Sequence, residues 1–351
     1  MLDLNSLVAK HRELYLLLDS FKGEKKFISD WNCEHPFYSE IFSAITLSGS
    51  EIKNYNYIRA HDDLTQLISN FHLERENVTY SLDSILTSNG SATHISSFFV
   101  WIKTQGLKYV YYAPPLYYTF HFLAKIFEVE LRPIARKHMF DRTLDLNLPA
   151  SKCALIITDP IWYSGSPVGK EIIDKISQWQ IRTQSTIFVD GSFQYFKWNG
   201  EKTEYSSTFC NDNTFRLVCP SKALGTHGLR FSYLLLPERY YETFDFILDG
   251  ILGSSSAFDI SFAKACMNIL LSPQSNSQLI NYTQTTYQDL IENELIKTVI
   301  IPECGYFTFA EVNHTIAMDS VTMDGSFFEQ NAYRNYKRIN LLNPYLRKLL
   351  D

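Results

Sequence analysis

The segments that decide the fold are Ala154-Leu155-Ile156-Ile157-Thr158-Asp159-Pro160 and Thr186-Ile187-Phe188-Val189-Asp190-Gly191. Each is a short apolar run that ends in an aspartate, and a helical pattern from about Gly169 to Trp179 lies between them. Two buried strands joined by one helix form a βαβ unit, in which the strands run parallel. This stretch therefore predicts an α/β fold.

The same alternation extends to both sides of this unit. Apolar residues Ile95, Phe98, Phe99 and Ile102 follow helical spacing, and Asn89 or Ser91 is a candidate cap for that helix. A second, aromatic helix is expected from about Tyr117 to Phe127. Further strands are expected at 109–112, 129–133, 214–218 and 232–236. We therefore expect a mainly parallel sheet over residues 85–237.

The two flanks have a different character. From about Tyr241 a helical periodicity gives way to a strand-like stretch at Gly305–Phe309, and the chain ends in an expected helix. We expect a large domain over residues 51–240 and a smaller α+β domain over residues 241–351. Residues 1–50 carry mixed helical signals, and we expect this segment to pack with the small domain.

Composition narrows the class of protein. The 351 residues are 45% hydrophobic and 20% charged, which is typical of a globular chain, and the net charge of −6 disfavours a nucleic-acid partner. No stretch is apolar enough to span a membrane, and the N-terminus does not resemble a signal peptide. Six widely spaced cysteines indicate neither disulfides nor a metal site. We expect a cytoplasmic protein without a metal site.

Residues that follow the strands define the candidate site, because ligands of open α/β sheets bind at the carboxyl ends of the strands. Gly90-Ser91-Ala92 at a helix start offers backbone N–H groups to an anion, and Arg230 adds a charge-assisted contact to a phosphate. Lys222 on a partly dry floor could form an imine, and Asp190 could hold a protonated ring nitrogen. Together these groups describe a pyridoxal 5'-phosphate (PLP) site.

These residues also carry a resemblance to a known family. Ser221-Lys222-Ala223-Leu224-Gly225-Thr226-His227-Gly228-Leu229-Arg230-Phe231-Ser232-Tyr233 resembles the S-K-x-x-G-x-x-G-x-R-x-G-Y stretch of the fold-type-I PLP enzymes, specifically the class I/II aminotransferases. The likeness runs from about residue 55 to the C-terminus. It implies that Lys222 is the Schiff-base lysine, that Arg230 binds the cofactor phosphate and that Asp190 meets the pyridine nitrogen.

Other segments resemble the family in the expected order. Thr87–Ser91 is similar to its phosphate loop and Ala113–Tyr117 to a segment that supplies a ring stacking on the cofactor, for which Tyr117 is the candidate and a core aromatic the alternative. Tyr336–Leu341 resembles a late element whose arginine, here Arg338, takes the substrate carboxylate; a cation on the surface is the alternative. The resemblance also includes Asp159 and Ser221 among the cofactor-binding residues.

Three positions depart from the family pattern, and one of them is Ser232, which stands where the family has a glycine. The family's Asn and Tyr that donate to the phenolic oxygen of the cofactor fall at Trp162 and Phe193. Tyr163 or the Trp162 indole is a candidate replacement. A tyrosine that family members contribute from the partner chain of a homodimer matches Tyr55 or Tyr57 only loosely.

The resemblance implies a homodimeric enzyme acting on an α-amino acid. Amino transfer to a 2-oxo acid co-substrate is the first expectation. Elimination, cyclisation or oxidation of an amino acid, for example of an arginine derivative, is the alternative, since both oxygen donors are replaced. A third hypothesis is a PLP-binding protein without catalytic activity, and a bound cofactor without turnover would identify it.

Overall fold

A computed structural model describes residues 26–57, 61–137, 145–201, 203–272, 276–325 and 333–350, and the single residues 9 and 12. The predicted cores of both the large and the small domain lie within these ranges, whereas most of residues 1–25 lie outside them. Within them, no helix is both long and apolar enough to cross a membrane.

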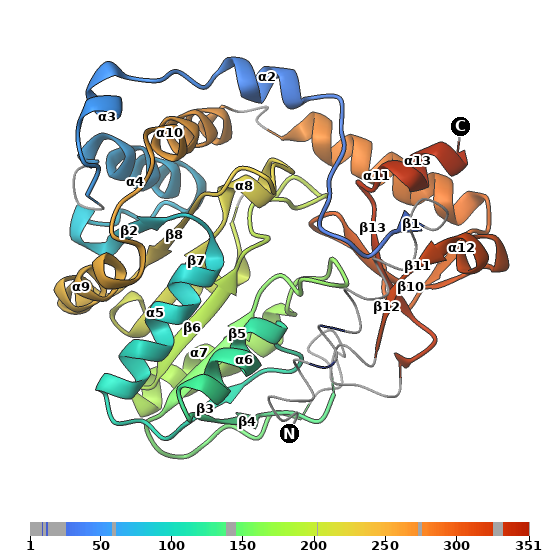
Figure 1. Ribbon diagram of the computed structural model, residues 1–351. Coiled ribbons are helices and arrows are strands. Elements are labelled where there is room, and N and C mark those ends of the chain that lie inside the picture. Colours follow the sequence, from blue (N-terminus) through green and yellow to red (C-terminus); the bar gives the residue numbers. More distant parts are fainter. Residues whose placement is uncertain are drawn as a thin grey trace.

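A seven-stranded sheet forms the centre of the molecule (Figure 1). Its order is β2-β8-β7-β6-β5-β3-β4, and β8 runs antiparallel to both of its neighbours while the remaining pairs are parallel. The strands are β2 (Ile85–Ser88), β3 (Tyr109–Tyr112), β4 (Glu130–Pro133), β5 (Ala154–Thr158), β6 (Thr186–Gly191), β7 (Thr214–Val218) and β8 (Ser232–Leu235). The α/β fold with a mainly parallel sheet is thereby confirmed.

Both faces of this sheet are covered by helices because its strands are apolar at successive positions. In β5, Ala154 and Ile156 join a core with α5 (Ser91–Thr104), α6 (Tyr118–Ile126) and α9 (Tyr241–Leu252). Leu155 and Ile157 point to the opposite face and join a core with α7 (Lys170–Thr183). A third core lies under α4 (Asp62–Glu76) and α10 (Ala257–Leu271). Short helical segments complete this region: η2 (Leu82–Ser84), η3 (Tyr205–Thr208), η4 (Asn211–Asn213), α8 (Pro220–Ala223) and η5 (Glu238–Tyr240).

The C-terminal part builds a smaller antiparallel sheet, at the right of Figure 1, in the order β12-β13-β10-β9. The N-terminal segment reaches this region, since β1 pairs in parallel with β11. The elements are β1 (Lys26–Phe27), α2 (Tyr38–Ser43), α3 (Gly49–Lys53), α11 (Ser277–Glu292), β9 (Ile296–Thr298), β10 (Phe307–Val312), α12 (His314–Asp319), β11 (Ser320–Val321), β12 (Met323–Asp324), β13 (Lys337–Asn340) and α13 (Pro344–Leu350).

Backbone hydrogen bonds fasten the small sheet to loops of the large one just before β10. The carbonyl of Gly165 accepts from the N–H groups of Glu303 (2.7 Å) and Cys304 (2.9 Å), and the N–H of Gly305 donates to the carbonyl of Phe196 (2.8 Å). Gly165 has φ +65°, and a Cβ atom there would stand 2.3 Å from the carbonyl oxygen of Phe307. The close approach of the two parts therefore requires a glycine.

Two local details differ from the sequence-based expectation. Residues 85–88 form the edge strand β2, which is not among the strands expected from the sequence, although they lie within the region expected to form the sheet. The residue at the N-cap of α5 is Gly90, and no side chain caps this helix, so neither Asn89 nor Ser91 has that role. The first N–H groups of α5 are consequently left for another partner.

Candidate active site

The parallel strands β5, β6 and β7 end together and place their following residues at one edge. Thr158 pairs with Asp190 and Gly191 pairs with Val218, so the three strand ends are in register. Lys222 follows β7 in the short helix α8, whose turn is closed by the Lys222 N–H donating to the carbonyl of Cys219 (2.9 Å). The edge therefore brings Asp190 and the Lys222 turn onto neighbouring strands, as expected for a ligand site of this fold class.

Lys222 is half-buried and its amine lies among aromatic rings. The Nζ atom is 4.6 Å from the centre of the Phe193 ring and 5.8 Å from that of Trp31. No ion pair to Lys222 occurs among the residues that the structure describes. The amine thus lies against apolar rings and forms no ion pair with a described residue, so its nitrogen can react with a ligand.

Asp190 is buried at the end of β6 with one side-chain oxygen occupied. Its Oδ1 accepts from the backbone N–H (3.1 Å) and the hydroxyl (2.5 Å) of Ser192. These donors fix the carboxylate, and no described residue hydrogen-bonds its other oxygen. Asp190 can therefore accept a further hydrogen bond from a ligand.

Arg230 lies against the start of α5. A Cβ atom on Gly90 would stand 2.4 Å from Nη2 of Arg230, and Gly90 has φ +101°. The exposed guanidinium keeps one internal contact, from Nη1 to the carbonyl of His227 (3.2 Å). The start of α5 at Ser91 and Ala92 adds the positive end of the helix dipole. The positive charge of Arg230 and the uncapped N–H groups at the start of α5 together form a corner that can bind an anion.

Two residues named from the sequence are engaged elsewhere. The hydroxyl of Ser221 donates to the carbonyl of Phe231 (3.1 Å), which leaves only its lone pairs for a ligand. Asp159 is buried, its Oδ1 accepts from the N–H of Val168 (3.0 Å), and its Oδ2 has no partner among the described residues. Burial raises the pKa of Asp159.

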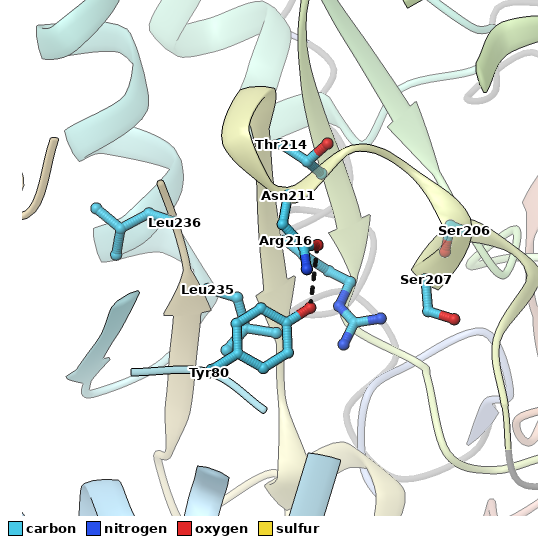
Figure 2. A pocket seen from close by; sticks show the side chains of 8 residues that line it. All are labelled: Tyr80, Ser206, Ser207, Asn211, Thr214, Arg216, Leu235 and Leu236. Carbon is cyan, nitrogen blue, oxygen red and sulfur yellow. Dashed lines mark hydrogen bonds between the residues drawn. The ribbon is translucent and has the colours of Figure 1, made fainter. Parts of the chain in front are cut away.

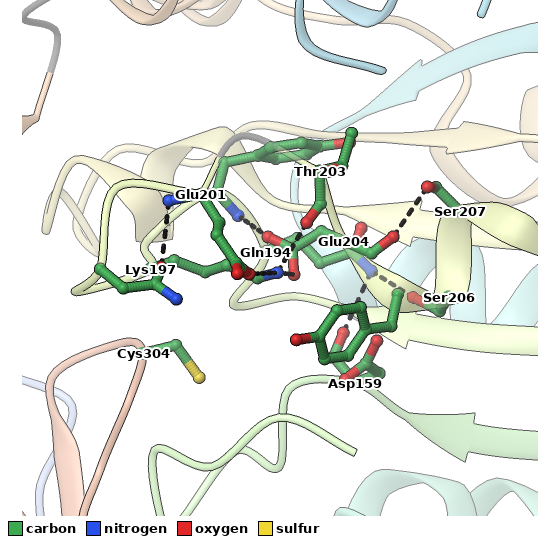
Figure 3. A network of polar contacts seen from close by, with 12 residues as sticks. Asp159, Gln194, Lys197, Glu201, Thr203, Glu204, Ser206, Ser207 and Cys304 are labelled. Carbon is green, nitrogen blue, oxygen red and sulfur yellow. Dashed lines mark hydrogen bonds and ion pairs between the residues drawn. The ribbon is translucent and has the colours of Figure 1, made fainter. Parts of the chain in front are cut away.

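Asp159 belongs to a buried polar network (Figure 3). Gln194 donates from Nε2 to the Asp159 carbonyl (3.1 Å), while Lys197 Nζ donates to the carbonyl of Thr203 (2.6 Å) and lies 3.7 Å from Oε2 of Glu204. Burial, with a further contribution from Asp159, raises the pKa of Glu204 to about 7. These contacts hold the loop that follows β6 in place.

Arg338 is fully buried in β13. Its Nη2 donates to the carbonyl of Ser29, whereas Nε and Nη1 have no partner among the described residues. The guanidinium carbon lies 4.0 Å from the centre of the Trp31 ring and 4.5 Å from that of Phe307. Burial lowers the pKa of Arg338 to about 10, so it stays charged at neutral pH. A buried cation with open donors is suited to an incoming carboxylate.

Tyr117 stands at the N-cap of α6 and belongs to the same aromatic group. Its ring centre is 5.2 Å from that of Trp162 and 5.8 Å from that of Trp31, in both cases edge to face. Its hydroxyl donates to the hydroxyl of Tyr118 (2.7 Å). The structure thus brings Tyr117 and Trp162 together with the rings beside Lys222.

Trp31 was missed in the sequence, and it is the residue that joins the two halves of the site. Its ring lies near Lys222 and Arg338, and it stacks at 6.0 Å on Trp162 and at 6.3 Å on Phe193. These contacts join parts of the chain that are far apart in sequence, which no local pattern can indicate. One sequence signal was available, a lone tryptophan in the polar stretch Asp30-Trp31-Asn32.

A second pocket can be separated from this site (Figure 2). It is small, with a volume of about 10 Å³ around Tyr80 and Arg216, and Tyr80 donates to Oδ1 of Asn211 (3.3 Å). Arg216 is buried and forms an ion pair of 2.6 Å with Glu76. Its charge is already neutralised, which disfavours this pocket as an anion site. In the described ranges no group of His, Cys, Asp and Glu side chains is arranged to hold a metal ion.

Comparison with solved structures places the fold. BacF from Bacillus subtilis with bound substrate superimposes with a TM-score of 0.79 at 16% identity, covering 98% of this chain and 95% of that chain. Aspartate aminotransferase from Thermotoga maritima gives 0.74 at 14% identity (98% and 95%). Aminotransferase AspB from Helicobacter pylori gives 0.76 at 13% identity (93% and 92%). At these identities the likeness establishes the fold.

Sequence comparison establishes the family. No curated protein matches the chain significantly. The model of aminotransferase class I and II, a PLP-dependent family, matches residues 34–342, which include every candidate site residue named above except Trp31. The chain therefore belongs to the class I and II aminotransferases of fold type I, with PLP as its cofactor.

Proposed function

We propose that this enzyme transfers the amino group of an α-amino acid to a 2-oxo acid. The observation that carries the proposal is the position of Lys222 and Arg338, both beside the Trp31 ring, with the Arg338 donors Nε and Nη1 open. Such an arrangement offers one point for the substrate amine and another for its carboxylate.

The residues at the sheet edge fit PLP. The start of α5 at Gly90, Ser91 and Ala92, together with Arg230, would hold the phosphate, and Asp190 would hold a proton on the pyridine nitrogen. When bound, PLP supplies an electron sink for the bond that breaks at Cα. The uncapped helix start and the open oxygen of Asp190 support these assignments.

Lys222 would hold the cofactor covalently until the substrate amine displaces it, and its freed amine would then take the proton from the substrate Cα. In the second half of the reaction it would deliver a proton to Cα of the amino acid formed from the 2-oxo acid. Arg338 would bind the substrate carboxylate and thereby orient the Cα–H bond toward the lysine. Trp31, Phe193 and Trp162 would exclude water from this proton transfer. Tyr117 would add a ring to the same wall, whereas Asp159 and Ser221 would act by holding the loops at the cofactor.

A second candidate reaction is elimination, cyclisation or oxidation of an amino acid, for example of an arginine derivative. One observation favours it: the nearer of the two rings beside the Lys222 amine belongs to Phe193, which has no hydrogen-bond donor for a phenolic oxygen. A requirement for a 2-oxo acid co-substrate separates the two reactions, because only amino transfer needs one.

We further propose a homodimer. The segment from α2 to residue 57 exposes a row of large apolar side chains, which indicates a covered surface in the assembled protein. These are Phe42, Leu47, Ile52, Tyr55 and Tyr57, each at least 50% exposed. A tyrosine from this row, Tyr55 or Tyr57, would approach the partner's phosphate site. Light scattering at several concentrations tests the dimer, and a monomer throughout would contradict it.

A cytoplasmic location is also part of the proposal. All six cysteines are unpaired, and four of them are buried. Free thiols persist in a reducing compartment, so this state of the cysteines supports the cytoplasm as the place where the enzyme works.

The test of the reaction is the visible absorbance of the PLP-loaded protein during titration with amino acids. We expect the absorbance of the bound cofactor to fall with a suitable amino acid and to return with a 2-oxo acid. Lys222→Ala should lose the reaction while keeping the fold. Lys170→Ala is the matched control, because Lys170 is an exposed lysine that forms an ion pair with Asp174 at the surface. Turnover by Lys222→Ala, or turnover without any 2-oxo acid, would contradict the proposal.

A further inference from the structure

A cavity adjoins the lysine on the side of the N-terminal segment. Its volume is about 410 Å³, it is partly open to solvent, and it lies between residues 31–42 and residues 226–229. Trp31 and His227 both line it, with their ring centres 6.0 Å apart. Because Trp31 is also 5.8 Å from the Lys222 amine, the same ring borders both the cavity and the reactive group.

The walls of this cavity are largely apolar. Ile41, Phe42 and Leu229 line it together with the face of Trp31. The polar lining groups are engaged within the protein. The Tyr38 hydroxyl donates to the carbonyls of Cys33 and Gly225, the Thr226 hydroxyl donates to the carbonyl of Ser221, and the Asn32 amide donates to Asp30. A large apolar or aromatic group would therefore bury its surface here with little loss of polar hydration.

No described residue that lines the cavity is charged at neutral pH. His227 shares a hydrogen bond with the Tyr306 hydroxyl, and burial and the nearby cations Lys222, Arg230 and Arg338 lower its pKa well below the ordinary value. Burial likewise raises the pKa values of Cys33 and Tyr38, so both stay neutral. A second charge on a substrate would thus enter this space without a partner, which is costly.

The cations near the cavity are not free for such a charge. In the proposed reaction Lys222 binds the cofactor and the substrate amine, Arg230 the phosphate, and Arg338 the α-carboxylate. None of these three residues lines the cavity. The side chain of the substrate is the part left to occupy it.

We infer that this cavity receives the substrate side chain, and that the enzyme selects amino acids with bulky uncharged side chains, aromatic ones foremost. The inference rests on the proposed function, since it assigns the substrate class of the same site. Trp31 contributes specificity by offering its ring to the side chain, in stacked or edge-to-face contact.

The experiment compares a panel of amino acids on the PLP-loaded full-length protein. Equilibrium binding is measured by calorimetry and amino transfer by kcat/KM with one 2-oxo acid. We expect phenylalanine, tyrosine, tryptophan and leucine to exceed aspartate, glutamate and lysine by about 100-fold in both quantities. Charged amino acids that bind and react as well as the bulky neutral ones would overturn the inference and leave amino transfer intact.

Other outcomes separate the two proposals. Preferential binding of the bulky neutral amino acids without amino transfer would support the cavity assignment and contradict the reaction. Absence of binding by any bulky neutral amino acid would overturn the cavity assignment whatever the reaction is.

Three variants test the walls directly. Trp31→Ala should weaken the preference for phenylalanine over alanine about tenfold, and Trp31→Phe, which keeps an aromatic face, should retain most of it. Leu229→Arg places a cation in the cavity and should shift the preference toward aspartate and glutamate. Circular dichroism should show that Trp31→Ala and Leu229→Arg are folded. If both folded variants rank the amino acids by kcat/KM in the same order as wild type, the assignment is contradicted.

Discussion

The guanidinium of Arg230 occupies the space that a side chain on Gly90 would need. A Cβ atom at Gly90 would stand 2.4 Å from Nη2 of Arg230, and the φ of +101° is one that residues with a side chain rarely adopt. The two residues are 140 positions apart in the sequence, yet together they form the corner assigned to the cofactor phosphate.

Gly90→Ala should therefore weaken PLP binding about tenfold, because the arginine must move away from the helix start. Backbone strain should also lower the free energy of unfolding by about 1–3 kcal/mol. Gly106→Ala is the matched control, since Gly106 also has positive φ but a Cβ atom there would meet no other atom within 4 Å. Cofactor titration of both variants checks this, and equal affinities would refute the role of the corner.

Asp190→Asn should reduce kcat at least on the order of 100-fold, because an amide holds the proton on the pyridine nitrogen poorly. The fold should persist, since the Ser192 donors can still reach the side-chain oxygen. Ser192→Ala removes only one of these donors and should cost far less. Single-turnover absorbance changes measure the effect, and a fully active Asp190→Asn enzyme would exclude the assigned role.

Arg338→Met should raise KM for α-amino acids about 100-fold, because a charge-assisted contact to the carboxylate is lost. The substrate-free variant should unfold at the same or a higher temperature, since two buried donors of Arg338 lack partners among the described residues. The decisive control is an amine without the carboxylate: wild type should discriminate against it, and the variant should not. Retained discrimination would place the carboxylate elsewhere.

Phe193→Tyr should lower, by about one unit, the pH at which the visible absorbance of bound PLP changes. A hydroxyl on this ring, which lies 4.6 Å from the Lys222 amine, would donate to the cofactor oxygen and favour its deprotonated form. Phe193→Leu lacks the donor and serves as the control. A midpoint that does not fall in the tyrosine variant would mean that residue 193 is turned away from that oxygen.

The buried network around Glu204 predicts a pH-dependent stability. Because burial raises the pKa of Glu204 to about 7, its contribution to stability is present below the ordinary carboxyl pKa and is lost as the pH rises through 7. Wild type should lose on the order of 1–3 kcal/mol from this group between pH 5 and pH 8. In Glu204→Gln the decline should be smaller, because the amide does not titrate. Urea unfolding at the two pH values measures it, and parallel declines would contradict the assignment.

The sequence was sufficient for six of the seven strands of the large sheet and for the strand ends at which the candidate site residues lie. Apolar runs ending at Asp190 and before Lys222 are local signals, and the spacing from Lys222 to Arg230 is a short motif. Chain order alone then places them at one edge, because parallel strands end on the same side.

The remaining features depend on contacts between distant parts of the chain. The position of Trp31 is set by Arg338 and Phe307, and the engagement of the Ser221 hydroxyl by the backbone of Phe231. Asp159 lies at a strand end, as expected, but its Oδ1 accepts a hydrogen bond from the backbone N–H of Val168, nine residues later in the chain. Contacts of this kind leave no periodic pattern or motif in the sequence from which they could be predicted.

The backbone ties between Gly165, Phe196 and residues 303–305 have a consequence for the length of the substrate backbone. They join the sheet that carries Arg338 to the loops beside Lys222, so they restrain the distance between these two side chains. If Lys222 and Arg338 have the proposed roles, this distance suits an α-amino acid, in which one carbon atom separates the amine from the carboxylate. An amino acid with an additional carbon between them would have to break those ties or leave one end unbound.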